Sequence, residues 1–184
     1  MGGDSSIPAA AREAVARYPL CFVASLDEDG SPNLSPKGTI RVWDADHLVF
    51  ADVASPQTVA NIARDDRVHV NVVDHFARRG WRFTGRACIT RDPAVLDAIR
   101  AEYPGEPYPF EQAVLVRVEE ARELISPSYA LRKTEAELRH EYLALGDGPG
   151  AEPGALGVRT GVVCRSCERG AVVRDGLCDA CAAS

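Results

Sequence analysis

Residues 32–38 read PNLSPKG and form the second of five short strands that we expect, with one helix among them, between residues 20 and 88. The two prolines of this segment cannot donate to a sheet ladder, so we expect the strand to be an edge strand or to be bulged. Such a strand would leave the amides of Ser35 and Lys37 free, together with nearby carbonyls. These groups would suit a planar, polar ligand.

The rest of the chain predicts a β-rich domain with short helices. Ser55 followed by Pro56 is typical of a helix start, with serine as the cap and proline at the first helical position. Gly85 marks a bulge or a close backbone approach within its strand. Many short strands with few helices favour a closed or partly open β-barrel. We expect a helix at 8–18, one from 55 with Val59, Ile62 and Ala63 inward, one capped by Asp92 with Val95, Leu96 and Ile99 inward, and one that begins with a capping box of Thr134 and Glu137. We expect strands at 20–26, 32–43, 47–52, 68–72, 81–90 and 113–125.

Composition limits the kind of protein this chain can be. Its 184 residues suit one main domain plus an appendage, and 46% apolar residues suffice for a core. The net charge of −6 argues against a nucleic-acid partner, which normally requires a basic stripe. We find no apolar run long enough to span a membrane and no signal peptide. We therefore expect a cytoplasmic protein whose six cysteines are thiols or metal ligands, with Cys21 and Cys88 buried and inert.

A glycine-rich segment divides the chain. Residues 146–157 contain five glycines and two prolines, which is typical of a flexible linker. We therefore expect a main domain with a helical extension at residues 1–145, the linker, and a separate small module at residues 158–184.

The small module carries two Cys-x-x-Cys pairs separated by ten residues. Each pair places two thiolates on one tight turn, and two such turns can hold a tetrahedral ion. A module of this size cannot build its own apolar core, so we expect a zinc ribbon stabilised by its metal. Iron in a rubredoxin-like site and two redox dithiols are the alternatives. The near-neutral charge favours protein docking or stabilisation of a neighbouring subunit. The expected ligands are Cys164, Cys167, Cys178 and Cys181.

The main domain has a candidate for each group that a flavin mononucleotide (FMN) needs. The amides at the helix start, residues 55–58, can bind the phosphate, and Lys37 can add a positive charge. Asn33 and the backbone around Ser35 can meet the pyrimidine edge of the ring. Apolar cover for the ring can come from Trp81, Phe50 and Val53.

In this order, these pieces resemble the pyridoxamine 5′-phosphate oxidase-like flavoproteins, the FMN-binding split β-barrels. The matching segments are 32–38 (PNLSPKG), 48–52 (LVFAD), 56–62 (PQTVANI) and 80–87 (GWRFTGRA). The resemblance covers a little over a third of the chain closely, and about two thirds with the later strand and helix. It implies a mainly β (α+β) fold, a split β-barrel with short helices, for the main domain at 1–145.

The resemblance also implies a homodimer with two FMN sites at the subunit interface. Gln57 and Thr58 occupy phosphate-binding positions that are often basic in the true oxidases, a departure that shifts weight onto Lys37 and Arg82. The residues expected to bind the cofactor are Asn33, Ser35, Pro36, Lys37, Gly38, Ala51, Asp52, Gln57, Thr58, Trp81 and Arg82.

The activity expected from this reading is FMN-dependent oxidoreduction of a small molecule, with no catalytic acid or base identified. The C-terminal helix and zinc ribbon replace the substrate-binding end of the true oxidases, so we do not expect vitamin B6 oxidation. Two alternatives remain open. One is a reductase of the same fold that uses a deazaflavin coenzyme, and the other is a non-enzymatic flavin-binding sensor whose zinc ribbon docks a partner.

Overall fold

The computed structural model describes residues 6–18, 20–102 and 109–146. The chain divides into two compact units, Met1–Leu138 and Arg139–Ser184. The helices are α1 (Ala9–Arg17), α2 (Pro56–Arg64), α3 (Pro93–Glu102) and α4 (Glu135–Gly146), with a short 3-10 helix η1 (Pro127–Tyr129). The strands are β1 (Cys21–Leu26), β2 (Pro32–Lys37), β3 (Arg41–Val42), β4 (His47–Ala51), β5 (Arg67–Asp74), β6 (Arg79–Thr90) and β7 (Ala113–Ile125).

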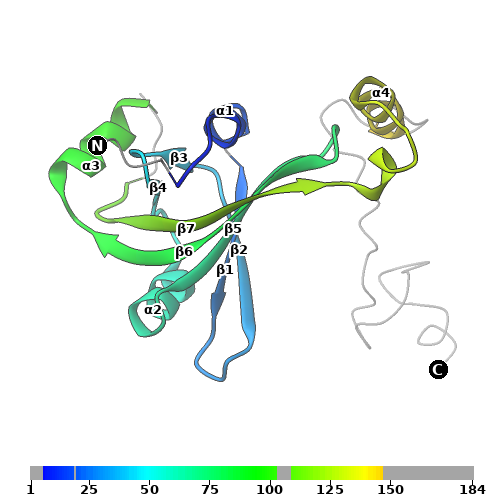
Figure 1. Ribbon diagram of the computed structural model, residues 1–184. Coiled ribbons are helices and arrows are strands. Elements are labelled where there is room, and N and C mark those ends of the chain that lie inside the picture. Colours follow the sequence, from blue (N-terminus) through cyan, green and yellow to red (C-terminus); the bar gives the residue numbers. More distant parts are fainter. Residues whose placement is uncertain (1–5, 19, 103–108, 147–184) are drawn as a thin grey trace, which may run out of the picture. The chain divides into compact units, whose positions relative to one another are not determined.

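The strands form one curled sheet in the first unit. Their order is β2-β1-β5-β6-β7-β4-β3, and every neighbouring pair is antiparallel. Figure 1 shows the long strands β6 and β7 sweeping across the sheet, with short helices beside it. This curled half-barrel with short helices is consistent with the split barrel expected from the sequence.

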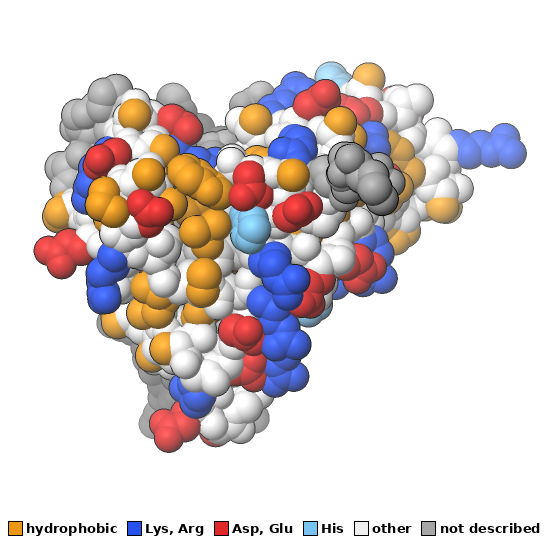
Figure 2. Space-filling model, turned by 60° about the vertical axis from the view of Figure 1, so that its left-hand side comes forward, with side chains coloured by type: hydrophobic (Ala, Val, Ile, Leu, Met, Phe, Trp, Pro, Cys, Tyr) orange, Lys and Arg blue, Asp and Glu red, His pale blue; other side chains and the backbone are white. Residues whose placement is uncertain are grey.

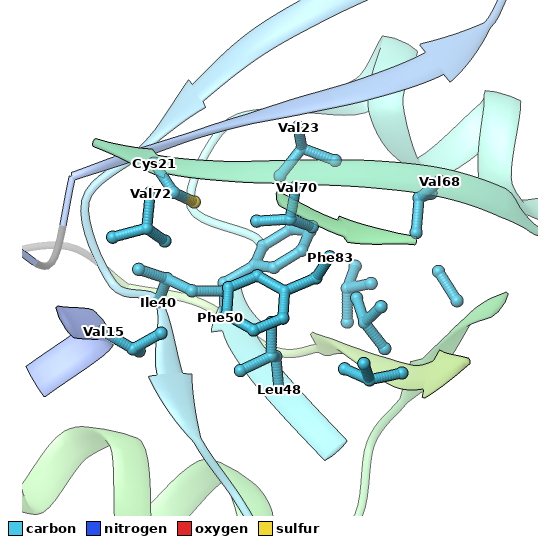
Figure 3. Close-up of a cluster of buried hydrophobic side chains, with 14 of the residues drawn as sticks. Val15, Cys21, Val23, Ile40, Leu48, Phe50, Val68, Val70, Val72 and Phe83 are labelled. Carbon is cyan, nitrogen blue, oxygen red and sulfur yellow. The ribbon is translucent and has the colours of Figure 1, made fainter. Parts of the chain in front are cut away.

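The main core lies on the inner face of the curl. Alternate residues of the strands point inward, as the two-residue period of a strand requires, and Figure 3 shows their side chains packed around Phe50 and Phe83. Helix α1 contributes Ala11 and Val15, and α2 contributes Ile62. The two helices therefore close the inner face of the sheet.

A second, smaller core lies on the outer face of β4 and β7. Helix α3 packs there through Val95, Leu96 and Ile99, which the sequence pattern predicted. Its start is capped by Asp92, whose carboxylate accepts a hydrogen bond of 2.9 Å from the Ala94 amide. Because β4 is buried on both faces, its sequence is continuously apolar from Leu48 to Ala51.

The proline-bearing strand β2 is an edge strand, as predicted, but its free groups differ from those expected. Pro36 lies opposite Phe22 in the ladder with β1. A proline can take only a position whose backbone faces away from the partner strand, and these positions alternate along the strand. The amides of Ser35 and Lys37 therefore face β1. The free edge instead offers the amide of Leu34 and the carbonyls of the proline and leucine positions.

The expected strand at 32–43 is broken. The structure has β2 up to Lys37 and the two-residue strand β3 at the opposite end of the sheet. Residues 38–40 cross between these two edges, so the second expected strand is two separate strands. Further along the chain, the register shifts between Thr84 and Gly85, which confirms the bulge predicted at the glycine.

One further detail of the sequence prediction is corrected and one is confirmed. The buried side of α2 consists of Thr58, Asn61 and Ile62, whereas Ala63, expected in the buried stripe, is exposed. Asn61 donates hydrogen bonds to Ser25 in β1 and to Asp27 in the β1–β2 turn, so polar contacts replace part of the apolar stripe. The capping box of α4 is present, since Thr134 and Glu137 exchange hydrogen bonds.

The described residues include two cysteines, Cys21 and Cys88. Cys21 is fully buried, as expected, but Cys88 is exposed because its face of β6 is not covered there. The linker at 146–157, apart from Gly146 at the end of α4, and the four expected metal ligands lie outside the described residues. Within the described part, no three His, Cys, Asp or Glu side chains gather to hold a metal ion. No helix in that part is long and apolar enough to cross a membrane.

Candidate functional site

Lys37 lies at the centre of the candidate site. It ends β2 with its side chain on the inner face, and only 6% of the residue is exposed. Its ammonium donates hydrogen bonds of 2.6 Å to the Ser35 hydroxyl and 2.7 Å to the Ser55 hydroxyl. Burial lowers the pKa of Lys37, and the negative charge of Asp52 opposes that shift. A buried ammonium with these partners is an unusual feature that the packing of the barrel does not require.

The loop before α2 is fixed by Asp52. One oxygen of its carboxylate accepts a hydrogen bond of 3.1 Å from the Ser55 amide, and the other accepts one of 2.8 Å from the Gln112 side chain. The Asp52 amide also donates to the Gln112 carbonyl at 3.1 Å. The sequence contained no signal for Gln112, because it comes from a distant segment just before β7.

The start of α2 has free amides. Val59 is the first residue of this helix whose amide donates to a carbonyl, that of Ser55, at 3.0 Å. Ser55 occupies the N-cap position without making a side-chain cap bond. The amides of Gln57 and Thr58 therefore have no acceptor among the described residues. Free amides at a helix start form an anion-binding position.

The side chain of Gln57 turns away from this position. It donates hydrogen bonds of 2.9 Å to the Asp27 carboxylate and 3.0 Å to the Asn61 side chain. Asn61 also bonds to Ser25 and Asp27, which ties the helix to the β1–β2 hairpin. The sequence predicted neither the hydrogen bonds of Gln57 nor those of Asn61. A buried asparagine on a short helix is nevertheless typical of a side chain held by specific hydrogen bonds.

Asn33 has an unsatisfied acceptor. It shares the inner face of β2 with Ser35 and Lys37, and its side-chain oxygen is buried with no hydrogen-bond partner in the described structure. Buried polar atoms are seldom left unpaired. A donor from a ligand at this strand would satisfy it.

Within one chain, Trp81 and Arg82 lie apart from the polar residues around Lys37 and the start of α2, which we call the Lys37 cluster. The strand register places four residues in one row across neighbouring strands: Lys37, Cys21, Val72 and Trp81. Trp81 is thus three strands from Lys37, roughly 14 Å along the curled sheet at the usual strand spacing. Arg82, as the next residue, points to the opposite face, where it donates a hydrogen bond of 3.0 Å to Asn71. Within one chain, the side chains of Arg82 and Lys37 therefore lie on opposite faces of the sheet.

The other predicted positions border the cluster. Ala51 is buried and ends β4, and its amide donates to the Thr39 hydroxyl at 2.9 Å. Pro36 is exposed beside Lys37, and a side-chain carbon built at Gly38 would meet no atom within 4 Å. Phe50, expected to cover a ring, is instead part of the core.

A hollow of about 600 Å³ lies elsewhere, on the outer face of β4, β6 and β7. Figure 2 shows basic side chains gathered in a column on one face of the molecule, with acidic side chains beside them. The strand register places Arg67, Arg86, Arg117 and His47 in one row, and each has an acidic neighbour within 4 Å. Because these charges are already paired, we assign the hollow no ligand and prefer the Lys37 cluster.

Comparison with protein families identifies the class of protein. Residues 7–125 match the family described as pyridoxamine 5′-phosphate oxidase. The match spans most of the first unit and includes every strand. The chain therefore belongs to the pyridoxamine 5′-phosphate oxidase family of split barrels. A search of the curated proteins found no match.

Solved structures with the same fold include HupZ, an FMN-binding protein and an F420 reductase. HupZ from Group A Streptococcus is 27% identical, with a TM-score of 0.59, and the alignment covers 65% of this chain and 95% of that one. An FMN-binding protein from Syntrophomonas wolfei is 15% identical, with a TM-score of 0.57 and coverage of 65% and 87%. An F420 reductase is 21% identical, with a TM-score of 0.52 and coverage of 63% and 98%. The last two likenesses show the fold alone.

The residues present fit a flavin. The buried acceptor of Asn33 suits the N–H on the pyrimidine edge of the ring, and the free amides of Gln57 and Thr58 suit a phosphate. In the described part, Lys37 is the only lysine or arginine of the cluster. The donors and acceptors of one chain are therefore compatible with a flavin, with backbone amides at the position that suits its phosphate.

Proposed function

We propose that this protein binds FMN and is an FMN-dependent oxidoreductase acting on a small molecule. The observation that carries the proposal is the uncapped start of α2 beside the inner face of β2, within a domain of the pyridoxamine 5′-phosphate oxidase family. When bound, FMN supplies the redox chemistry, and the protein positions it and adjusts its potential.

The proposed contacts with FMN use the residues of the Lys37 cluster. The amides of Gln57 and Thr58 bind the phosphate, and Asn33 together with the Leu34 backbone meets the ring edge. Ser35 acts indirectly by holding the Lys37 ammonium, and Asp52 acts indirectly by holding the loop before α2. Pro36, Gly38 and Ala51 border the ring and its ribityl chain, by analogy with the family.

A homodimer would complete the site. Trp81 lies three strands from Lys37, and Arg82 points to the opposite face of the sheet, so we propose that they serve the site of the partner. The outer face of the sheet near β2 supports an interface, because four large apolar side chains are exposed there. These are Leu20 (55% exposed), Phe22 (42%), Leu34 (65%) and Val73 (37%).

The experiment that tests FMN binding is the absorption spectrum of the purified protein, followed by titration of the flavin-free protein with FMN. We expect a bound flavin spectrum and saturable binding. Parallel titrations with riboflavin and with the deazaflavin F420 separate the alternatives. Uptake of F420 without FMN would replace the proposal by a deazaflavin-dependent reductase. Flavin binding without turnover of any tested reductant or oxidant would favour the sensor alternative.

The C-terminal module completes the proposal. We propose that Cys164, Cys167, Cys178 and Cys181 hold one zinc ion in a ribbon, on the spacing argument alone. The ribbon would stabilise the module and offer a docking surface for a protein partner.

A further inference from the structure

Lys37 and Ser55 hold each other in an arrangement that leaves the start of α2 open. Ser55 occupies the N-cap position, where a serine hydroxyl ordinarily accepts a hydrogen bond from the second or third amide of the helix. Here its oxygen accepts from the Lys37 ammonium at 2.7 Å instead, and the cap bond does not form. The Ser55 hydroxyl thus contacts a residue 18 positions earlier in the chain, and it makes no contact with the amides of its own helix.

The surroundings of Lys37 keep it in this position. A second hydrogen bond of 2.6 Å joins it to Ser35, and its nitrogen stands 5.9 Å from the centre of the Phe50 ring. Asp52, whose negative charge acts on the ammonium, also holds the Ser55 backbone. The ammonium is thus directed at two hydroxyls and balanced by a carboxylate.

We propose that Lys37 is a positioning residue, which holds the Ser55 hydroxyl away from α2 so that the Gln57 and Thr58 amides stay free for a phosphate group. The inference rests on the proposed FMN binding and goes beyond it, because the phosphate is bound by backbone amides and not by the ammonium. It explains how a site without basic residues in the first turn of α2 remains open to an anion.

The inference predicts how Lys37 and Ser55 depend on each other. With Lys37→Met, which replaces the side chain by an apolar one of similar length, the Ser55 hydroxyl is free to cap the helix. A phosphate must then displace that cap. We expect FMN affinity to fall about fivefold, the equilibrium equivalent of a typical serine cap.

The test compares Lys37→Met in the parent and in a Ser55→Ala background, by titration of flavin-free protein. We expect the loss of about fivefold in FMN affinity only where Ser55 is present, and a loss below about twofold in the Ser55→Ala background. Riboflavin, which lacks the phosphate, should change by less than about twofold in both. Equal losses of about tenfold or more in both backgrounds would mean that the ammonium binds the phosphate directly, and would overturn the inference.

A second measurement needs no flavin. Amide hydrogen exchange of Gln57 and Thr58 in the flavin-free protein should slow by about fivefold at one of them in Lys37→Met, and should not slow in the double variant. Lys133→Met is the matched control, since it removes the other lysine of the chain. Unchanged exchange in Lys37→Met would overturn the inference. If the parent binds no FMN, the proposed function fails, while the exchange result still decides the relation between Lys37 and Ser55.

Discussion

The phenol of Tyr18 donates a hydrogen bond to the carboxylate of Asp74, joining the residue after α1 to the last residue of β5. Asp74 is 3% exposed, and its other oxygen accepts from the amides of Phe76 and Ala77 at 3.0 and 2.9 Å. One buried carboxylate thus fixes both the β5–β6 turn and the end of the first helix.

Tyr18→Phe should destabilise the protein by about 1.5–3 kcal/mol, because it removes a hydrogen bond to a buried charged group. Tyr129→Phe is the graded control, since its hydroxyl donates to a neutral acceptor, the Ala77 carbonyl, at 2.6 Å. It should cost about 1 kcal/mol. Urea unfolding of the three proteins gives the order, and an equal cost for both variants would contradict the special role of Asp74.

Gly85→Ala should destabilise the sheet at the bulge. A side-chain carbon at this position would lie 2.1 Å from the Arg117 carbonyl oxygen, which belongs to the backbone of β7 and cannot move aside alone. We expect a loss of about 1–3 kcal/mol or more in the free energy of unfolding. Gly38→Ala is the stability control, because the same carbon there meets no atom within 4 Å. Similar melting temperatures for both variants would show that the bulge relaxes freely.

Cys21 should make stability fall at high pH. Burial raises the pKa of its thiol from 9.0 to about 12, against the opposing effect of Lys37. The folded state therefore keeps a proton that the unfolded state loses between pH 9.0 and about 12, so stability declines across this window. Each pH unit corresponds to about 1.4 kcal/mol, which gives a loss of about 4 kcal/mol at the upper end.

The measurement is the unfolding free energy of the parent and of Cys21→Ala from about pH 8 to about pH 11. The variant is expected to start less stable because it leaves a cavity, but its curve should decline less steeply than that of the parent. Parallel curves would mean that Cys21 does not titrate in this range.

Leu34→Glu should weaken the proposed dimer. The residue is 65% exposed on the outer face of β2, and a carboxylate in an apolar interface is costly to bury. We expect association to weaken by about tenfold or more, seen as a shift toward monomer in light scattering after size-exclusion chromatography. Leu131→Glu is the control, because this leucine is 77% exposed but follows η1, away from that face. A parent that is monomeric with FMN bound would refute the dimer.

Cys178→Ser should remove the proposed zinc ion. Elemental analysis of the parent is expected to give about one equivalent of zinc per chain, and the variant should lose it because three thiolates bind much more weakly than four. Cys88→Ser, which changes an exposed cysteine of β6, should keep the metal. Iron in place of zinc would support the rubredoxin-like alternative.

Much of the fold could be predicted from local patterns. The bounds of β7, the cap at Asp92 and the capping box at Thr134 follow from periodicity and from short-range hydrogen bonding, which the sequence displays directly. The same reasoning predicted that β2 is either an edge strand or bulged, because a proline cannot donate to a regular central ladder, and the structure shows the edge position.

The errors concern relations between distant segments. Which face a residue occupies depends on the register with its neighbours, so the sequence did not show that Arg82 points away from Lys37. The exposure of a residue depends on what covers its face of the sheet, which explains the exposed Cys88. Ser55 was correctly placed at the helix start, but its bond to Lys37 is a tertiary contact that overrides the local preference.

The prolines of β2 also bear on solubility at high concentration. Three of its six residues face the open edge of the sheet, and two of these lack an amide hydrogen, so Leu34 is the sole donor along that edge of the strand. Another strand would find almost no backbone donors to pair with, which is one way in which natural proteins discourage edge-to-edge growth of sheets into aggregates. The edge can therefore stay uncovered for the proposed ligand without promoting polymerisation.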